Sequence, residues 1–293
     1  MLPDTKHHFA FWGTPRFAEI VLEQLIAAGQ KPTLIICNPD RPVGRKQLLI
    51  EPPTKVLADK NGIEVAQPET KEDIMALLEK LQKMDFAVVA AYSKILPKEI
   101  VEAPKLGTIG VHPSLLPHYR GASPIQSAIL AGEEKTGVSL YLMDEKMDHG
   151  KIISKSEFKI SNENYEELEA RLAELGGKKL AEIIPALEFA LEQALEQEHG
   201  HATFTKKFVT SDGEVNMEKD SPGEIDRKIR ALNPEPGVYT YNFPERSGKR
   251  VKLLDAKLVD NELKIKRIHP EGKNPIDLSW KTIHPHRERR GWS

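Results

Sequence analysis

Two segments of this chain contain residue types that suit proton transfer and the binding of a negatively charged oxygen. One is the proline-punctuated stretch Gly110–Gly121, which includes His112. The other is the turn Met143–Gly150, which includes Asp148, 36 positions after the histidine. An aspartate beside an imidazole orients the ring, sets its tautomer and raises its basicity. Transfer of an acyl group to an amine needs this combination, because the amine loses a proton while negative charge develops on the former carbonyl oxygen.

Asp144 competes with Asp148 as the partner of the histidine. It follows the apolar run Leu140–Met143, which favours a residue at a strand end or in a turn. Asp148 is followed two positions later by Gly150, which permits a tight turn that swings a carboxylate onto the imidazole. We therefore predict that His112 and Asp148 form the pair. The alternative for a lone loop histidine is an ordinary surface or hydrogen-bonding residue.

The elements that position these residues alternate between apolar strands and amphipathic helices. A strand, a glycine turn, a helix and a second strand open the chain, which is typical of a parallel β–α–β unit. The predicted strands are His8–Trp12, Thr33–Cys37, Phe86–Ala91 and Thr108–Val111. The predicted helices are Phe17–Ile26, Asp73–Lys83, Lys98–Glu102, Ile125–Ala131 and Tyr165–Leu195. This pattern predicts an α/β fold whose sheet is covered on both faces and binds ligands at the carboxyl ends of its strands.

The pattern changes after Glu198–Gly200, a plausible linker. Short β-like runs at Gly237–Phe243, Arg250–Leu258 and Glu262–Ile268 are separated by Pro, Gly and Asn. They predict a small β-barrel or an open fragment of one. The charge changes too, from net −7 over residues 1–200 to net +5 over residues 201–293. A basic C-terminal part favours contact with a polyanion, and a chance fluctuation of surface charge is the alternative.

Composition limits the class of protein. The 293 residues are 39% hydrophobic and 29% charged, as in globular proteins, and Cys37 is the single cysteine. We expect a reducing, cytoplasmic environment without a disulfide, a leader peptide or a membrane-spanning segment. We also expect no metal site, because His7–His8 and His284–His286 lack acidic or cysteine partners at ligand spacing.

A basic loop precedes the second predicted helix. It contains Arg41, Arg45 and Lys46 together with Gly44. Guanidinium groups and a lysine suit phosphate contacts, so the loop predicts a nucleic-acid interface that does not itself read sequence. An ordinary solvated loop is the alternative.

Several motifs in order resemble the 10-formyltetrahydrofolate-dependent formyltransferase family, and within it the branch that formylates methionyl-tRNA. They lie at Phe11–Ala18, Asp40–Arg45, His112–Gly121, Thr136–Val138, Met143–Gly150 and Ile229–Pro234. The resemblance covers about residues 8 to 258. It implies a Rossmann-like formyltransferase domain at 1–196, a linker at 197–207 and a shortened OB-like β domain at 208–293.

The resemblance also implies an activity and roles for particular residues. A monomeric enzyme would transfer formyl from 10-formyltetrahydrofolate to the α-amino group of initiator methionyl-tRNA. His112 would bind the oxygen of the intermediate, and Asp148 would hold the histidine and pass protons. The folate site would be lined by Ser114, Leu115, Leu116 and Pro117. The tRNA would be contacted by Arg41, Arg45 and Lys46.

One departure from the family concerns the reaction directly. Gly110 stands where the family has an asparagine whose amide is expected to hydrogen-bond the formyl oxygen. Loss of one such donor costs about 10²–10³ in rate, although a water in the space recovers part of it. The sequence leaves three readings: an enzyme weakened at Gly110, a folate- or RNA-binding homologue without activity, and a formyltransferase acting on nucleotide sugars. Under the first, Gly110→Asn is expected to be about two orders of magnitude faster.

Overall fold

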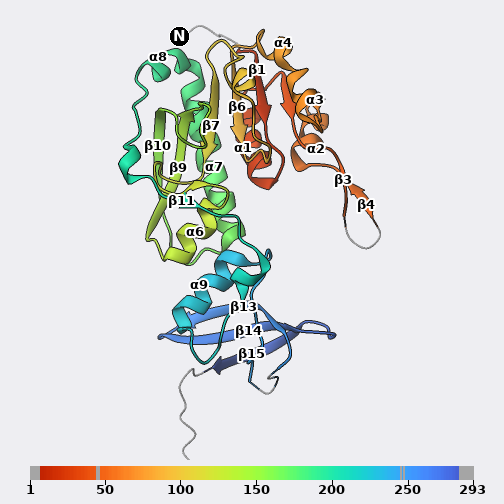
Figure 1. The fold of residues 1–293 in the computed structure, drawn as a ribbon, viewed down its shortest axis with the longest axis vertical. Helices are drawn as coiled ribbons and strands as arrows, with labels where there is room; N and C mark the ends of the chain where they lie inside the picture. The colour runs from red at the N-terminus through yellow and green to blue at the C-terminus, as the bar shows by residue number, and fades with distance from the viewer. Residues whose placement is uncertain (1–6, 44–46, 245, 247, 284–293) are drawn as a thin grey trace, which may run out of the picture. The chain divides into compact units, whose positions relative to one another are not determined.

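The computed structural model describes residues 7–43, 47–244, 246 and 248–283. Contacts within the chain divide it into two compact units (Figure 1). The first comprises Met1–Gly121, Lys135–Lys159 and Glu169–Phe204, and the second comprises Ala122–Glu134, Ile160–Leu168 and Thr205–Ser293. The domain boundary placed at residues 196–208 by the sequence stays a prediction.

A seven-stranded sheet forms the centre of the first unit, in the order β10-β9-β7-β6-β1-β2-β5. Its strands are β1 (Phe9–Trp12), β2 (Leu34–Ile36), β5 (Glu64–Ala66), β6 (Phe86–Ala90), β7 (Thr108–His112), β9 (Lys135–Leu142) and β10 (Ile152–Lys159). The first five are parallel, and β9 and β10 extend the sheet in antiparallel fashion. The predicted α/β sheet is thus confirmed, with an antiparallel extension that was not predicted.

Helices cover both faces of this sheet. On one face, alternate residues of β1, β2 and β6 pack against α3 (Lys71–Met75), α4 (Leu78–Leu81) and α5 (Lys98–Val101). On the other face lie α1 (Arg16–Ala27) and α7 (Tyr165–Ile183), where Gly176 lies against Val111 and Val138. Helix α2 (Pro53–Lys60) packs beside α1, β2 and β5.

Two predicted helices are shorter than the sequence pattern indicated. The single helix predicted over Tyr165–Leu195 is interrupted after α7 by the 3₁₀ turn Ile184–Ala186, and α8 spans Leu187–Glu192. The interruption contains Pro185, whose ring and missing N–H are incompatible with the interior of an α-helix. The helix predicted over Asp73–Lys83 is instead the pair α3 and α4.

The second unit combines two helices with an antiparallel sheet. The helices are α6 (Pro124–Ala131) and α9 (Pro222–Leu232), and the sheet has the order β12-β13-β14-β15. Its strands are β12 (Tyr239–Thr240), β13 (Val251–Val259), β14 (Glu262–Pro270) and β15 (Ile276–Ile283). The prediction of a small C-terminal β domain is confirmed, whereas α9 and β15 were not predicted. A capping box between Ser221 and Glu224 begins α9.

Several short elements complete the described part of the chain. They are β3 (Arg41–Val43), β4 (Leu48–Ile50), β8 (Arg120–Gly121), β11 (Phe204–Thr205) and the 3₁₀ turns His199–His201 and Thr210–Gly213. Strands β3 and β4 form a hairpin. Among the described residues, none of the helices has the length and apolar content to cross a bilayer.

Candidate active site

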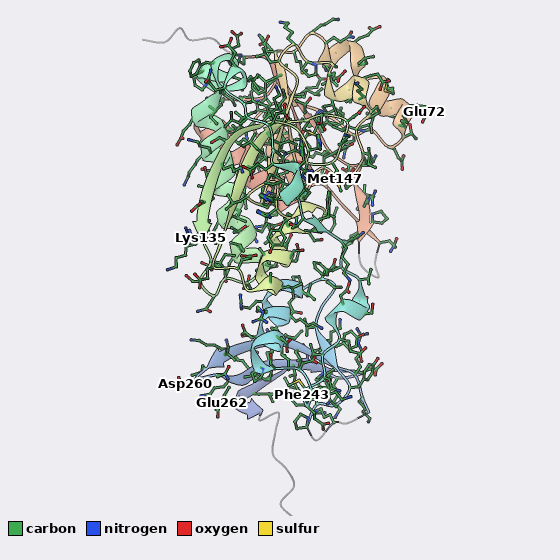
Figure 2. The ribbon with its side chains drawn as sticks, turned by 60° about the vertical axis from the view of Figure 1, so that its left-hand side comes forward. Glu72, Lys135, Met147, Phe243, Asp260 and Glu262 are labelled. Carbon is green, nitrogen blue, oxygen red and sulfur yellow. The ribbon has the colours of Figure 1, made fainter. Side chains whose placement is uncertain are left out.

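Asp148 lies in the turn between β9 and β10, with both carboxylate oxygens bound. Oδ1 accepts a hydrogen bond from the hydroxyl of Tyr141 at 2.7 Å, and Oδ2 accepts one from the backbone N–H of Gly121 at 2.7 Å. The backbone of Asp148 is in the left-handed region (φ 52°), a conformation that aspartate tolerates better than most residues. Its neighbour Met147, labelled in Figure 2, is 61% exposed, whereas the Asp148 side chain is 13% exposed. The turn therefore aims the carboxylate inward.

His112 ends strand β7 and is buried. Its Nε2 donates to the backbone carbonyl of Tyr119 at 2.9 Å, and since a carbonyl only accepts, Nε2 carries a proton. Its Nδ1 lies 3.6 Å from Oδ2 of Asp148, longer than a hydrogen bond. The structure brings the predicted pair together as neighbours, with the carboxylate held by Tyr141 and Gly121. Such contacts often tighten only when substrate is bound.

The space beside Gly110 is filled by an aromatic ring. Gly110 in β7 pairs directly with Tyr141 in β9, and a Cβ atom at position 110 would overlap Cε1 and Cζ of that ring. The hydroxyl oxygen of Tyr141 would lie 2.8 Å from the same Cβ. The suggestion that a water fills this space is therefore wrong. This contact could not be predicted from the sequence, because it depends on which residue of β9 faces Gly110.

Tyr141 places a protonated hydroxyl in the centre of the site. Its side chain is 4% exposed, and burial raises the pKa of the phenol well above its ordinary value, with the charge of Asp148 adding to the effect. The hydroxyl keeps its proton at neutral pH and serves as a hydrogen-bond donor. A buried tyrosine usually has such a partner, since an unpaired hydroxyl is costly to bury.

The loop predicted to line the folate site is held mainly by its own hydrogen bonds. The side chains of Ser114 and Leu116 are fully buried. The hydroxyl of Ser114 donates to the carbonyl of His118 at 2.6 Å. The hydroxyl of Ser139 accepts from the N–H of Leu116 and donates to the carbonyl of Ser114. Leu115 is only half-buried. Its side chain and the loop backbone are the groups best placed to contact a ligand.

Gln197 connects the two segments singled out from the sequence. Its amide nitrogen donates to the carbonyls of Asp148 at 3.0 Å and Gly150 at 2.7 Å, and its oxygen accepts from Arg120 at 2.6 Å. Gln197 is 6% exposed. The sequence analysis missed this role, because Gln197 lies in the stretch predicted to be a linker and no motif surrounds it.

A second histidine–aspartate pair adjoins the same turn. Nδ1 of His149 donates to Oδ2 of Asp144 at 2.7 Å, and the rings of His149 and His199 stack with centroids 4.0 Å apart. Arg120 donates to Nδ1 of His199 at 2.9 Å, which requires that nitrogen to be unprotonated. Desolvation lowers the pKa of His199 first, and the neighbouring His149 and Arg120 lower it further. Asp144 therefore belongs to a separate pair beside the site.

The basic loop is only partly described. Arg41 begins the β3–β4 hairpin and is exposed, while Arg45 and Lys46 lie outside the described residues. Asp40, just before the hairpin, accepts hydrogen bonds from Lys55 and Gln67, each at 2.7 Å. The bond from Lys55 is the largest cause of the lowered pKa of Asp40. The hairpin is thus anchored at its base. Its second strand is apolar and exposed, with Leu48, Leu49 and Ile50 between 53% and 68% accessible.

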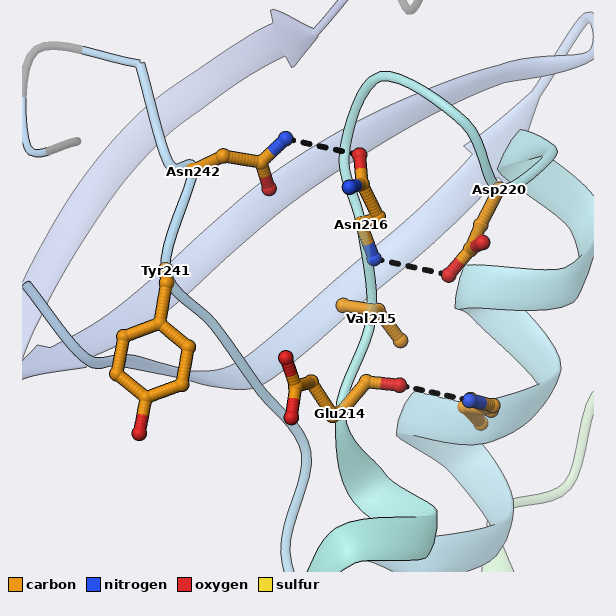
Figure 3. Close-up of a pocket in the computed structure, with 7 residues that line it drawn as sticks. Glu214, Val215, Asn216, Asp220, Tyr241 and Asn242 are labelled. Atoms are coloured by element: carbon orange, nitrogen blue, oxygen red, sulfur yellow. Dashed lines mark hydrogen bonds between the residues drawn. The ribbon is translucent and has the colours of Figure 1, made fainter. Parts of the chain in front are cut away.

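A small polar pocket lies in the second unit (Figure 3). Its polar groups bind one another: Asn242 donates to Asn216, the N–H of Asn216 donates to Asp220, and Lys228 donates to the carbonyl of Glu214. These hydrogen bonds occupy part of the polar lining of the pocket. Within the described part of the chain, no group of three or more His, Cys, Asp or Glu residues is arranged to hold a metal ion.

Comparisons with known proteins assign the chain to a family. The formyl transferase family model matches residues 6–184, and the model of the formyl transferase C-terminal domain matches residues 207–267. The chain belongs to the formyl transferase family. It is 39% identical to a methionyl-tRNA formyltransferase of Sulfurihydrogenibium sp., over 86% of this chain and 81% of the relative. It is 38% identical to the methionyl-tRNA formyltransferase of Staphylococcus aureus, over 85% of this chain and 79% of that protein.

Solved structures resemble the chain at lower identity. HypX from Aquifex aeolicus in complex with tetrahydrofolic acid has a TM-score of 0.61 at 17% identity, covering 94% of this chain and 46% of that one. An N-formyltransferase from Helicobacter canadensis has a TM-score of 0.60 at 19% identity, covering 88% of this chain and 95% of that one. At these identities the likeness concerns the fold alone.

Proposed function

We propose that this protein transfers a formyl group from 10-formyltetrahydrofolate to the α-amino group of initiator methionyl-tRNA. One observation carries the proposal: relatives named for this activity are 38–39% identical over at least 85% of the chain. The formyltransferase folds that resemble it at 16–19% identity, including enzymes that act on sugars, match only distantly.

The reaction joins the amine nitrogen to the formyl carbon and then breaks the bond from that carbon to N10 of the folate. Negative charge develops on the formyl oxygen, and the amine gives up a proton that finally reaches N10. Asp148 is suited to receive the amine proton, because it is a partly buried carboxylate whose position is fixed by Gly121 and Tyr141. We propose that His112 binds the formyl oxygen through its Nε2 proton, which in the structure is donated to the carbonyl of Tyr119 and would be shared with the formyl oxygen once substrate is bound.

Recognition of the tRNA is proposed for the hairpin around the basic loop. Arg41 is exposed at its start, and Arg45 and Lys46 supply two further cations in sequence. Cations of this kind bind phosphates and give affinity that falls with salt. We propose that the folate contacts the loop Ser114–Pro117 through Leu115 and the backbone, since the side chains of Ser114 and Leu116 are fully buried.

The first test is single-turnover formylation of charged initiator tRNA with 10-formyltetrahydrofolate in excess. We expect formylmethionyl-tRNA to accumulate with one exponential phase. The same tRNA with its amine acetylated is the control, because it offers no nucleophile. If the protein formylated a nucleotide amino sugar and did not formylate the methionyl-tRNA, the proposed acceptor would be contradicted.

A further inference from the structure

A cross-strand pair lies at the centre of the site, in which Gly110 of β7 faces Tyr141 of β9. Aromatic rings commonly cover a facing glycine in a sheet, and here the ring takes the volume that a side chain at position 110 would need. The hydroxyl oxygen ends 2.8 Å from where the Cβ of that side chain would be. An asparagine at 110 would put its amide nitrogen at a comparable distance from its own Cβ.

We propose that the hydroxyl of Tyr141 donates a hydrogen bond to the formyl oxygen in the transition state, in place of a side-chain amide at position 110. Tyr141 is then a catalytic residue supplied by the opposite strand. This inference rests on the proposed function, because it needs an oxygen that becomes negatively charged during formyl transfer.

The hydroxyl of Tyr141 has a single proton, which in the structure forms a hydrogen bond to Oδ1 of Asp148. When Asp148 receives the proton of the attacking amine on Oδ1, the carboxyl becomes a donor and the oxygen of Tyr141 becomes its acceptor. The proton of Tyr141 then turns from Asp148 to the formyl oxygen. When the intermediate collapses, the proton on Asp148 leaves for N10 and the hydroxyl returns to its first partner. No bond to the tyrosine forms or breaks.

A purely space-filling role does not need the hydroxyl. A phenylalanine would cover Gly110 equally well and would avoid burying a polar group. The hydroxyl is 2.7 Å from Asp148, and the two side chains are 4% and 13% exposed. In such a site, shielded from water, a donor aimed at a developing charge has its largest effect.

The test compares the rate of formyl transfer by the parent chain and by Tyr141→Phe. We expect the single-turnover rate to fall about 10²–10³-fold, with little change in the KM for the folate. Tyr239→Phe is the matched control, because that tyrosine also donates to a carboxylate, Glu214 at 3.3 Å, and lies in the second unit. The control is expected to keep the parent rate.

Substitutions at position 110 distinguish a hydrogen-bonding role of Tyr141 from a purely space-filling role. The faster rate that the sequence alone predicted for Gly110→Asn is no longer expected. This single variant should instead lower the rate, because its side chain collides with the ring of Tyr141. The double variant Gly110→Asn with Tyr141→Leu removes the ring and supplies an amide from β7. We expect it to be at least 10-fold faster than Tyr141→Leu alone. Equal rates for the parent and Tyr141→Phe would overturn the proposal, and so would a double variant no faster than Tyr141→Leu.

Each variant is also assayed with 10-formyltetrahydrofolate alone, where water is the acceptor. The same negatively charged oxygen forms whichever nucleophile attacks. Suppose that the parent chain hydrolyses 10-formyltetrahydrofolate but does not formylate methionyl-tRNA, and that Tyr141→Phe lowers the rate of this hydrolysis. That result would support the role of Tyr141 and overturn the proposed acceptor. A parent chain inert in both assays would overturn both proposals.

Discussion

Two histidine–aspartate pairs adjoin the same turn and differ in almost every respect. His149 and Asp144 are 2.7 Å apart, and their side chains are 25% and 39% exposed. His112 and Asp148 are 3.6 Å apart, and their side chains are 8% and 13% exposed. The tighter pair is the more solvated one. Hydrogen-bond length alone therefore does not separate a pair that faces inward from one that faces solvent.

The difference lies in what holds each carboxylate. Asp144 is bound by its own turn, since it accepts from the N–H of Lys146 and from His149. The carboxylate of Asp148 accepts hydrogen bonds from Tyr141 and Gly121, which lie in strands β9 and β8, and it makes none with His112. Because other groups hold the carboxylate of Asp148, it makes no hydrogen bond with Nδ1 of His112, which lies 3.6 Å from its Oδ2. This arrangement suits proton transfer, whereas the first suits a stable turn.

The largest effect that separates the two pairs is expected for Asp148→Asn. An amide accepts no proton from the amine, so the single-turnover rate of formyl transfer should fall about 10²–10⁴-fold. Asp144→Asn is the matched control and should change the rate less than about 3-fold, since exposed ion pairs contribute little. Rates that fall equally in the two variants would remove the distinction between the pairs.

A smaller effect is expected for Gln197→Ala, measured as the free energy of unfolding in urea. The change leaves the carbonyls of Asp148 and Gly150 and one N–H of Arg120 without their present partner. Buried groups deprived of partners cost about 1–3 kcal/mol. Asp144→Asn should cost about 0–1 kcal/mol, because its pair is partly exposed. An unfolding free energy unchanged by Gln197→Ala would show that the turn around Asp148 does not depend on the glutamine.

The smallest effect concerns His199, which stacks on the second pair. Because its pKa is lowered in the folded protein, it should titrate below its ordinary value of 6.5 in an NMR titration of the imidazole signals. The unfolded chain then binds the proton more readily, so this contribution to stability is present above pH 6.5 and is lost as pH falls toward the folded pKa. His199→Gln should make the melting temperature less sensitive to pH in that window. A midpoint at or above 6.5 would contradict this.

The sequence predicted the parallel core because its strands are continuous apolar runs, as in Phe86–Ala90. It missed β10, where burial only partly alternates along Ile152–Lys159 and the strand lies at the edge of the sheet. The capping box at Ser221 and Glu224 is a local sequence signal for the start of α9. Local chemistry therefore accounts for the parallel core, whereas β9 and β10 depend on pairing partners that cannot be predicted from their own residues.

The candidate site shows the same limit. His112 and Asp148 were predicted because their own segments carry a distinctive pattern. Tyr141 lies within the apolar run Leu140–Met143 and carries no distinctive pattern, since its importance depends on the pairing register that puts it opposite Gly110. Gln197 carries no pattern at all, because a glutamine acts through whichever carbonyls the fold brings to it.

The pairing of Gly110 with Tyr141 also constrains the order in which such a site can arise. An asparagine and a tyrosine cannot occupy these facing positions together without displacing atoms, as their overlap shows. A lineage that starts from an asparagine must therefore reach glycine before, or together with, tyrosine. An intermediate protein with glycine at position 110 and a residue smaller than tyrosine at position 141 has a void between the strands. It also has one hydrogen-bond donor fewer in the site. The two substitutions are thus a case of epistasis, and a homologue with glycine but no facing tyrosine would represent the costly step between two working arrangements.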